Sequence, residues 1–229
     1  MNLIASMKAR SAAKKMSAGD NVEAKRLYEE AIAAGLDEPR YILSYSVLLI
    51  REGDFQAARE LLVKHQNNRA LTPDSRRQLL VNYAVCVYKL GEIQKGVELL
   101  ERQHAKEPSG LVFETLGYLY IEQGDAEKAL AFNMDALAYD DEDPITLDNI
   151  GQTYYRLLHD KAQAKTYFDK AHEMKPGQID TLYFLAQYDV EAGNRDDARK
   201  KLTEALKGRF SPLNYATREK VEAQLATLA

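Results

Sequence analysis

Residues 116–144 read LGYLYIEQGDAEKALAFNMDALAYDDEDP and hold two amphipathic helical patterns joined by a short turn. Gly124 follows the first pattern, and Asp125 precedes the second. Glycine adopts the left-handed conformation that closes a helix, and an aspartate side chain caps the next helix by accepting a backbone N–H. The stretch therefore predicts a helix–turn–helix hairpin.

The same turn recurs along the chain at nearly constant intervals. Its glycines are Gly19, Gly53, Gly91, Gly124 and Gly193, with successive spacings of 34, 38, 33 and 69 residues. The last interval equals two repeats. The missing turn falls near His159-Asp160, where glycine is absent and one extra residue is expected to distort the turn. A period of this length is typical of an array of stacked helical hairpins.

Small residues accompany each turn and allow the paired helices to approach closely. They stand five positions after the glycine, at Ala24, Ala58, Gly96, Ala129 and Ala198, and Ala164 holds this place in the repeat without a glycine. At these positions the sequence resembles the tetratricopeptide repeat family. The match is clearest in LGYLYIEQGDAEKALAFNMDAL, in IGQTYY with AKTYFDKAHEMKP, and in FLAQYDVEAGNRDDARKKLTEAL, and it covers about residues 5–212.

The resemblance implies an all-α fold, a right-handed superhelical solenoid of about six repeats. We expect a single array over residues 1–229, with repeats at about 5–38, 39–76, 77–110, 111–143, 144–178 and 179–212. A capping helix is expected at 213–228, with Leu213, Val221, Leu225 and Leu228 as its apolar stripe. Thr72-Pro73-Asp74 is expected to start the helix after a longer linker.

Composition excludes several classes of protein. The net charge is only −4, divided as +3 over residues 1–110 and −7 over residues 111–229, so nucleic-acid binding is not expected. No apolar run approaches the about 18 residues of a membrane-spanning helix. The single Cys86 fits a reducing compartment, and the N-terminus lacks a secretory signal. We expect a cytoplasmic protein, or else one whose anchor lies upstream of Met1.

The sequence predicts no catalytic residue, no metal site and no cofactor. Its four histidines are scattered over separate repeats, and Cys86 lies in the apolar segment YAVCVYKL, which indicates a buried thiol. The acidic run at 140–143 lacks the spaced oxygens of a calcium loop and is interpreted as the start of a helix. Glycine-rich phosphate loops and hydrolase motifs are absent.

The family resemblance implies that a ligand lies in a concave groove lined by the first helix of each hairpin. The candidate groove residues are Arg40, Arg51, Asn82, Lys89, Glu114, Tyr118, Asp148, Asn149, Gln152, Tyr155, Tyr183 and Gln187. Asn82 and Asn149 stand where the family often hydrogen-bonds a peptide backbone, and an amide both donates and accepts. The alternatives are that the asparagines satisfy neighbouring polar groups, the tyrosines pack between repeats and the charges are solvated.

Two functional hypotheses follow from these residues. The first is a non-catalytic module that binds a peptide or helical segment of a partner protein. Its acidic side at Glu114, Asp148 and Asp180 favours neutral or basic segments. A chaperone-tail clamp is not expected, because the positions ahead of Asn82 and Asn149 carry no cations. The second is a self-associating scaffold subunit of a larger assembly, which pairs through the apolar side of the final helix.

Overall fold

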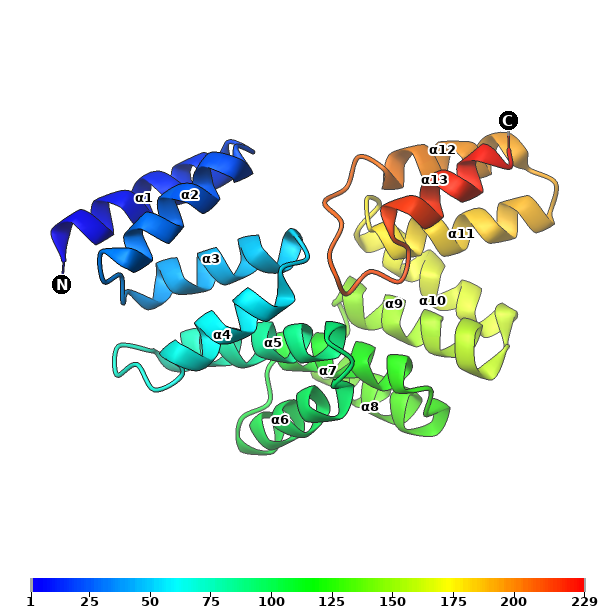
Figure 1. Ribbon diagram of the computed structural model, residues 1–229. Coiled ribbons are helices and arrows are strands. Elements are labelled where there is room, and N and C mark those ends of the chain that lie inside the picture. The colour runs from blue at the N-terminus through cyan, green and yellow to red at the C-terminus, as the bar shows by residue number, and fades with distance from the viewer. Residues whose placement is uncertain (1, 229) are drawn as a thin grey trace. The chain divides into compact units, whose positions relative to one another are not determined.

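The computed structural model describes residues 2–228, and the regular secondary structure of this part is helical (Figure 1). Within those residues there are thirteen α-helices and one π-helical turn, and there is no strand. The expected all-α fold is confirmed. The contacts divide the chain into two compact units, Met1–Lys106 and Glu107–Ala229, called here the N-terminal and C-terminal units.

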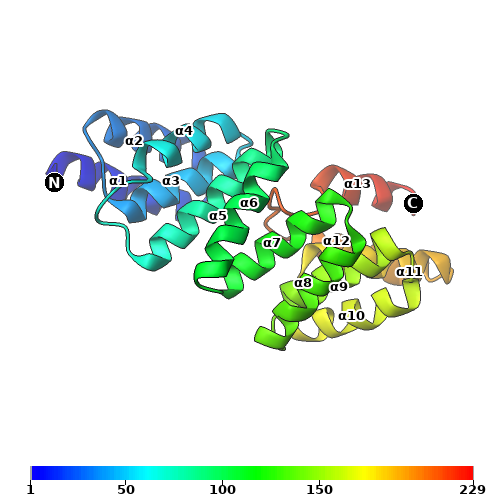
Figure 2. The same cartoon turned by 90° about the horizontal axis from the view of Figure 1, so that it is seen from below.

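The N-terminal unit consists of three helical hairpins stacked in chain order (Figure 2). They pair α1 (Leu3–Ser17) with α2 (Asn21–Ala33), α3 (Pro39–Arg51) with α4 (Phe55–His65), and α5 (Pro73–Lys89) with α6 (Ile93–Lys106). The first helices contact one another, α1 with α3 and α3 with α5. Leu48, Leu62 and Leu100 are fully buried between these layers, so each hairpin is covered by its neighbours.

The C-terminal unit continues the same construction. It pairs α7 (Gly110–Gln123) with α8 (Ala126–Tyr139), α9 (Pro144–Gln152) with α10 (Lys161–Met174), and α11 (Ile179–Glu191) with α12 (Arg195–Ala205). The turn η1 (Thr153–Leu158) extends α9, and α13 (Arg218–Ala226) packs on α12. Among residues 2–228, none of the helices combines the length and apolar character needed to cross a membrane.

The glycine turns have the conformation that the sequence predicts. Gly19, Gly53, Gly91, Gly124 and Gly193 all have φ between +80° and +83°. The following aspartates cap the second helices: Asp125 accepts a hydrogen bond from the backbone N–H of Lys128 at 3.0 Å. Two other predicted helix starts are confirmed. Thr72 caps α5 and Asp143 caps α9, each by accepting from the first turn of its helix.

The repeat without a glycine is distorted, as the extra residue predicts. The end of its first helix widens into the π-helical turn η1, where the N–H of Asp160 donates to the carbonyl of Tyr154 at 3.0 Å. His159 then takes the left-handed position, with φ of +55°. A π-helical turn accommodates one additional residue without breaking the helix, so α10 keeps its register against α9.

Small residues at the crossing points set how closely the helices pack. A Cβ atom on Gly151 would lie 2.7 Å from both Cδ1 and Cε1 of Phe168 on the facing helix α10. Phe168 has no room to withdraw, because it is fully buried and stacks on Phe184 with a centroid separation of 4.9 Å. The close approach of α9 and α10 therefore requires a residue without a side chain.

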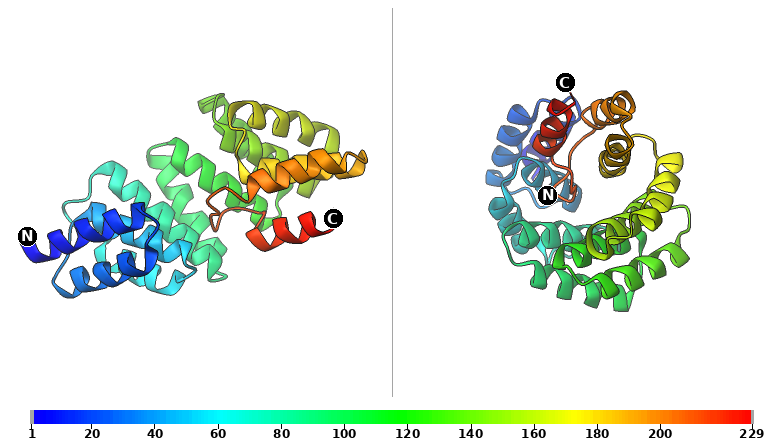
Figure 3. Two further views of the ribbon diagram at one scale, coloured as in Figure 1. Left: turned by 90° about the horizontal axis from the view of Figure 1, so that it is seen from above. Right: turned by 90° about the vertical axis from the view of Figure 1, so that its right-hand side faces the viewer.

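The final helix begins at Arg218, five residues after the start expected from the sequence. Thr217 caps it by accepting from the N–H of Lys220 at 3.3 Å. Residues 207–217, called here the strap, run without helical structure from the end of α12 to the start of α13 (Figure 1, Figure 3). Leu213 therefore lies outside the helix.

The apolar stripe of the final helix packs inside the C-terminal unit. Val221 and Leu228 are buried in one core cluster with Leu182 and Leu202, and Leu225 packs against that cluster. These side chains cover the apolar surface of α11 and α12 that no further repeat covers, as a capping helix does. Val221 is therefore not free to pair between chains, whereas Leu213 and Leu225, which the scaffold hypothesis also uses, are half-buried.

Candidate functional site

The twelve candidate groove residues are divided between the two compact units. Arg40, Arg51, Asn82 and Lys89 belong to the N-terminal unit, on α3 and α5. The remaining eight belong to the C-terminal unit, on α7, α9, η1 and α11. The surface formed by these four elements is called here the first-helix face.

The candidates in the N-terminal unit do not form one cluster. Arg40 and Arg51 stand at opposite ends of α3, about 17 Å apart along a helix that rises roughly 1.5 Å per residue. Asn82 is buried: its Nδ2 donates to Oγ of Ser46 at 2.9 Å, and its Oδ1 accepts from Nε2 of Gln78 at 2.7 Å. Its amide thus joins α3 to α5.

The candidates in the C-terminal unit lie on successive first helices. Tyr118, Asp148, Asn149 and Gln152 are buried, whereas Tyr155, Tyr183 and Gln187 are half-buried. Nδ2 of Asn149 donates to the carbonyl of Glu114 at 3.0 Å, which links α9 to α7. Both asparagines singled out by the sequence therefore make hydrogen bonds between repeats.

Two buried carboxyl groups lie next to each other on this face. Nε2 of Gln152 approaches Oδ2 of Asp148 at 2.7 Å and Oδ2 of Asp180 at 3.5 Å. Oγ1 of Thr181 also donates to Asp148, at 2.5 Å. Burial raises the pKa of both carboxyl groups, and for Asp148 the neighbouring Asp180 raises it further. The carboxyl groups of Asp148 and Asp180 are therefore stabilised by neighbouring groups that donate hydrogen bonds to them.

The strap supplies the donors that Asp180 needs. The backbone N–H of Tyr215 donates to Oδ2 of Asp180 at 3.1 Å, and the N–H of Ala216 donates to Oδ1 at 2.9 Å. Nδ2 of Asn214 adds a third hydrogen bond at 3.2 Å. A buried carboxylate without hydrogen bonds is costly in free energy, so these bonds stabilise the folded chain. They fix the non-helical course of the strap.

The ring of Tyr215 occupies an aromatic and cationic environment. It stacks on Phe184 with a centroid separation of 5.2 Å and an interplanar angle of 19°. The guanidinium carbon of Arg156 lies 4.1 Å from the ring centre, a cation–π distance. Tyr183 contacts the same ring edge-on, at 6.2 Å. A non-helical segment of polypeptide is therefore bound on the first-helix face, and it belongs to the chain itself.

Arg156 is held in place by partners on two helices. Its guanidinium donates to Oε1 of Gln152 at 2.9 Å and to Oε1 of Glu122, on α7, at 2.7 Å. Arg156 is not among the twelve candidates, and the second half of the strap was expected to belong to the final helix. One signal for the later start was available in the sequence, the capping threonine Thr217.

Two further ionisable groups have shifted acidities. Burial raises the pKa of Glu114 to about 7, and the nearby Asp143 raises it as well. Burial raises the pKa of the Cys86 thiol to about 12, so the thiol stays protonated at neutral pH and is a poor nucleophile. Within residues 2–228, no three His, Cys, Asp or Glu side chains come together in a way that could hold a metal ion.

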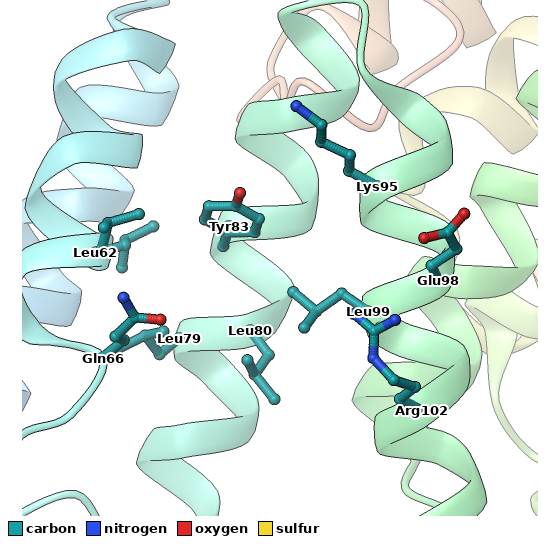
Figure 4. Close-up of a pocket in the computed structure, with 10 residues that line it drawn as sticks. Leu62, Gln66, Leu79, Leu80, Tyr83, Lys95, Glu98, Leu99 and Arg102 are labelled. Carbon is teal, nitrogen blue, oxygen red and sulfur yellow. The ribbon is translucent and has the colours of Figure 1, made fainter.

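A separate pocket of about 310 Å³ lies in the N-terminal unit, between α4, α5 and α6 (Figure 4). Leucine side chains from all three helices line it together with polar groups, and α6 contributes Lys95, Glu98 and Arg102. The lining residues are Leu62, Val63, Gln66, Leu79, Leu80, Tyr83, Lys95, Glu98, Leu99 and Arg102. This pocket is not evident from the sequence, because its walls come from three helices of two repeats.

A family model described as tetratrico peptide repeat matches residues 5–48 and 51–141, more than half of the chain. The chain belongs to the tetratricopeptide repeat family. This confirms the resemblance that the glycine turns and small residues indicated. Members of the family bind protein partners and are in general non-catalytic interaction modules. No curated protein sequence matches the chain.

Three solved structures share this tetratricopeptide repeat fold. PilW, titled a widely conserved type IV pilus biogenesis factor, superposes with a TM-score of 0.68 at 17% identity, covering 98% of this chain and 100% of PilW. TTC0263, a thermophilic protein from Thermus thermophilus, has a TM-score of 0.67 at 18% identity, covering 83% and 98%. MamA has a TM-score of 0.59 at 20% identity, covering 77% and 94%. At these identities the likeness shows the fold alone.

Proposed function

We propose that this tetratricopeptide repeat protein is a non-catalytic module that binds a peptide-like segment of a partner protein on the first-helix face of its C-terminal unit. One observation carries the proposal: the face already binds a non-helical segment, the strap, through Asp180, Phe184 and Arg156. Buried acceptors and aromatic rings of this kind suit a polypeptide ligand, because every residue presents a backbone N–H and some present a ring.

The half-buried residues of this face provide further contact area. Tyr155, Tyr183 and Gln187 lie on η1 and α11, and tyrosine is enriched at recognition surfaces because it buries area and keeps a polar tip. The acidic groups of this unit favour neutral or basic partner segments. The net charge of −7 over residues 111–229 supports the same preference.

Site-specific photo-crosslinking in the native organism tests this proposal. A photoreactive phenylalanine analogue at Gln187, on α11, is expected to capture a discrete partner. The same analogue at the exposed Thr166, on the outer helix α10, is the matched control and is expected to capture none. Capture of the same species from both positions, or from Thr166 alone, would place the binding surface elsewhere.

A further inference from the structure

We infer that the first-helix face selects a non-helical partner segment that carries an aromatic side chain next to free backbone N–H groups, and that the strap competes with it for the same place. This inference rests on the proposed function and names the chemistry of its ligand. It also assigns the strap a regulatory role, as an internal occupant that a partner must displace.

The first requirement on the ligand comes from Asp180. This carboxyl group is only 4% exposed, and the strap provides the hydrogen bonds from Asn214, Tyr215 and Ala216. If the strap leaves, the carboxyl group needs replacement donors, because an unpaired buried acceptor is costly. A residue beyond the first turn of a helix has already used its N–H. The replacement therefore needs successive free N–H groups, which a non-helical segment such as the strap provides.

The second requirement comes from the environment of the Tyr215 ring. Phe184, Tyr183 and Arg156 lie on α11 and η1, so they stay in place when the strap moves. Glu122 and Gln152 hold the Arg156 guanidinium in position. A preformed site with an aromatic surface and an oriented cation selects an electron-rich ring. A partner with an aliphatic residue at this place would lose the cation–π contact.

The strap is held by these contacts and by apolar packing, because Ala216 is fully buried in the core cluster with Leu182 and Leu202, and Phe210 packs against that cluster. Its remaining polar contacts are chiefly local, such as the N–H of Ser211 to Oδ1 of Asn214 at 2.7 Å and the N–H of Asn214 to the carbonyl of Ser211 at 2.9 Å. Helices α12 and α13 tether both of its ends, so its effective concentration at the face is high. The strap is closed when it lies on the first-helix face. The larger the fraction of closed molecules, the weaker the apparent affinity for a partner.

A peptide-binding experiment on the full chain tests the inference. The probe is a fluorescent peptide with the sequence of residues 208–217, GRFSPLNYAT. We expect its dissociation constant, measured by anisotropy, to be lower by about tenfold or more for Tyr215→Ala than for the wild type, because the competing strap is released. The matched control is Tyr167→Ala, which removes a stacked tyrosine from the outer helix α10 and is expected to leave peptide binding at the wild-type level.

A second peptide and a second variant complete the experiment. A peptide with alanine in place of its tyrosine is expected not to bind, which tests the aromatic requirement. Asn214→Ala removes one donor to Asp180 and a strap-internal contact, and it serves as the releasing variant if circular dichroism shows that Tyr215→Ala is misfolded. Equal affinity of the wild type and the releasing variant, no binding to either, or equal binding of the tyrosine-free peptide would overturn the inference.

Light scattering on the same samples measures the molecular mass and so tests whether a second copy of the chain occupies the face. A rise in mass on strap release, without peptide binding, would identify a second copy of the chain as the occupant and would overturn the inference. The two proposals also fail separately. If crosslinking at Gln187 captures a partner equally well with and without Tyr215→Ala, the proposed function stands and the competition by the strap does not.

Discussion

Side chains that look like ligand contacts in the sequence are used here to join repeats. Asn82 and Asn149 both donate across to the preceding first helix, and Asp148 accepts from α11. A polar residue at a repeat boundary has two sets of partners within reach, a ligand and the neighbouring repeat. Only the hydrogen-bond geometry shows which set is present in the free chain.

The single residue Glu114 predicts a pH dependence of the folding stability. Its pKa is raised to about 7, so between about pH 4.5 and 7 the folded chain holds a proton that the unfolded chain has lost. Stability from this group is fully present below that range and is lost as the pH rises through it. We expect the free energy of unfolding of Glu114→Gln, measured in urea, to fall less steeply with pH than that of the wild type. The exposed Glu127→Gln on α8 is the control, and equal slopes for all three proteins would contradict the assignment.

The turn between η1 and α10 shows how one inserted residue is absorbed. Five other hairpins turn through a glycine at φ near +80°, whereas this one widens into a π-helical turn and places His159 at +55°. An L side chain in that region costs roughly 1 kcal/mol. The insertion thus leaves the pairing of α9 with α10 intact and concentrates its cost in the turn.

His159→Gly is therefore expected to stabilise the chain by about 0.5–1 kcal/mol, because glycine adopts the left-handed conformation without strain. The reciprocal change, Gly193→His in the turn before α12, is expected to destabilise the chain by a similar amount. Urea unfolding of both variants measures the two effects. A loss of stability in His159→Gly would show that the side chain, rather than the backbone, sets the energy of this turn.

The chain is divided into two compact units, and within each unit a hairpin is covered by its sequence neighbours. Contacts of this kind make stability a sum of local terms, so a defect in one unit need not spread to the other. The strap and α13 cover the last hairpin, α11–α12, which has no following repeat.

Hydrogen exchange on Gly151→Ala tests this division. The added methyl group meets Phe168, and we expect a loss of about 1–3 kcal/mol from overpacking. Exchange should rise in peptides from residues 107–228 and stay at the wild-type level in peptides from residues 2–106. Gly177→Ala is the matched control, because nothing lies within 4 Å of its added Cβ. Equal loss of protection in both units would show that they unfold together.

The sequence by itself determined the hairpins, their order and their family, because helix caps, turn glycines and small contact residues act over a few residues and recur with the repeat. It also identified the distorted turn at His159 from one extra residue. The tertiary structure decided what lies on the first-helix face. The strap leaves the helix that its sequence suggested because the N–H groups of Tyr215 and Ala216 bond to Asp180, a residue about 35 positions earlier. A competition between a local helix and a distant buried carboxylate is settled only when the fold brings them together.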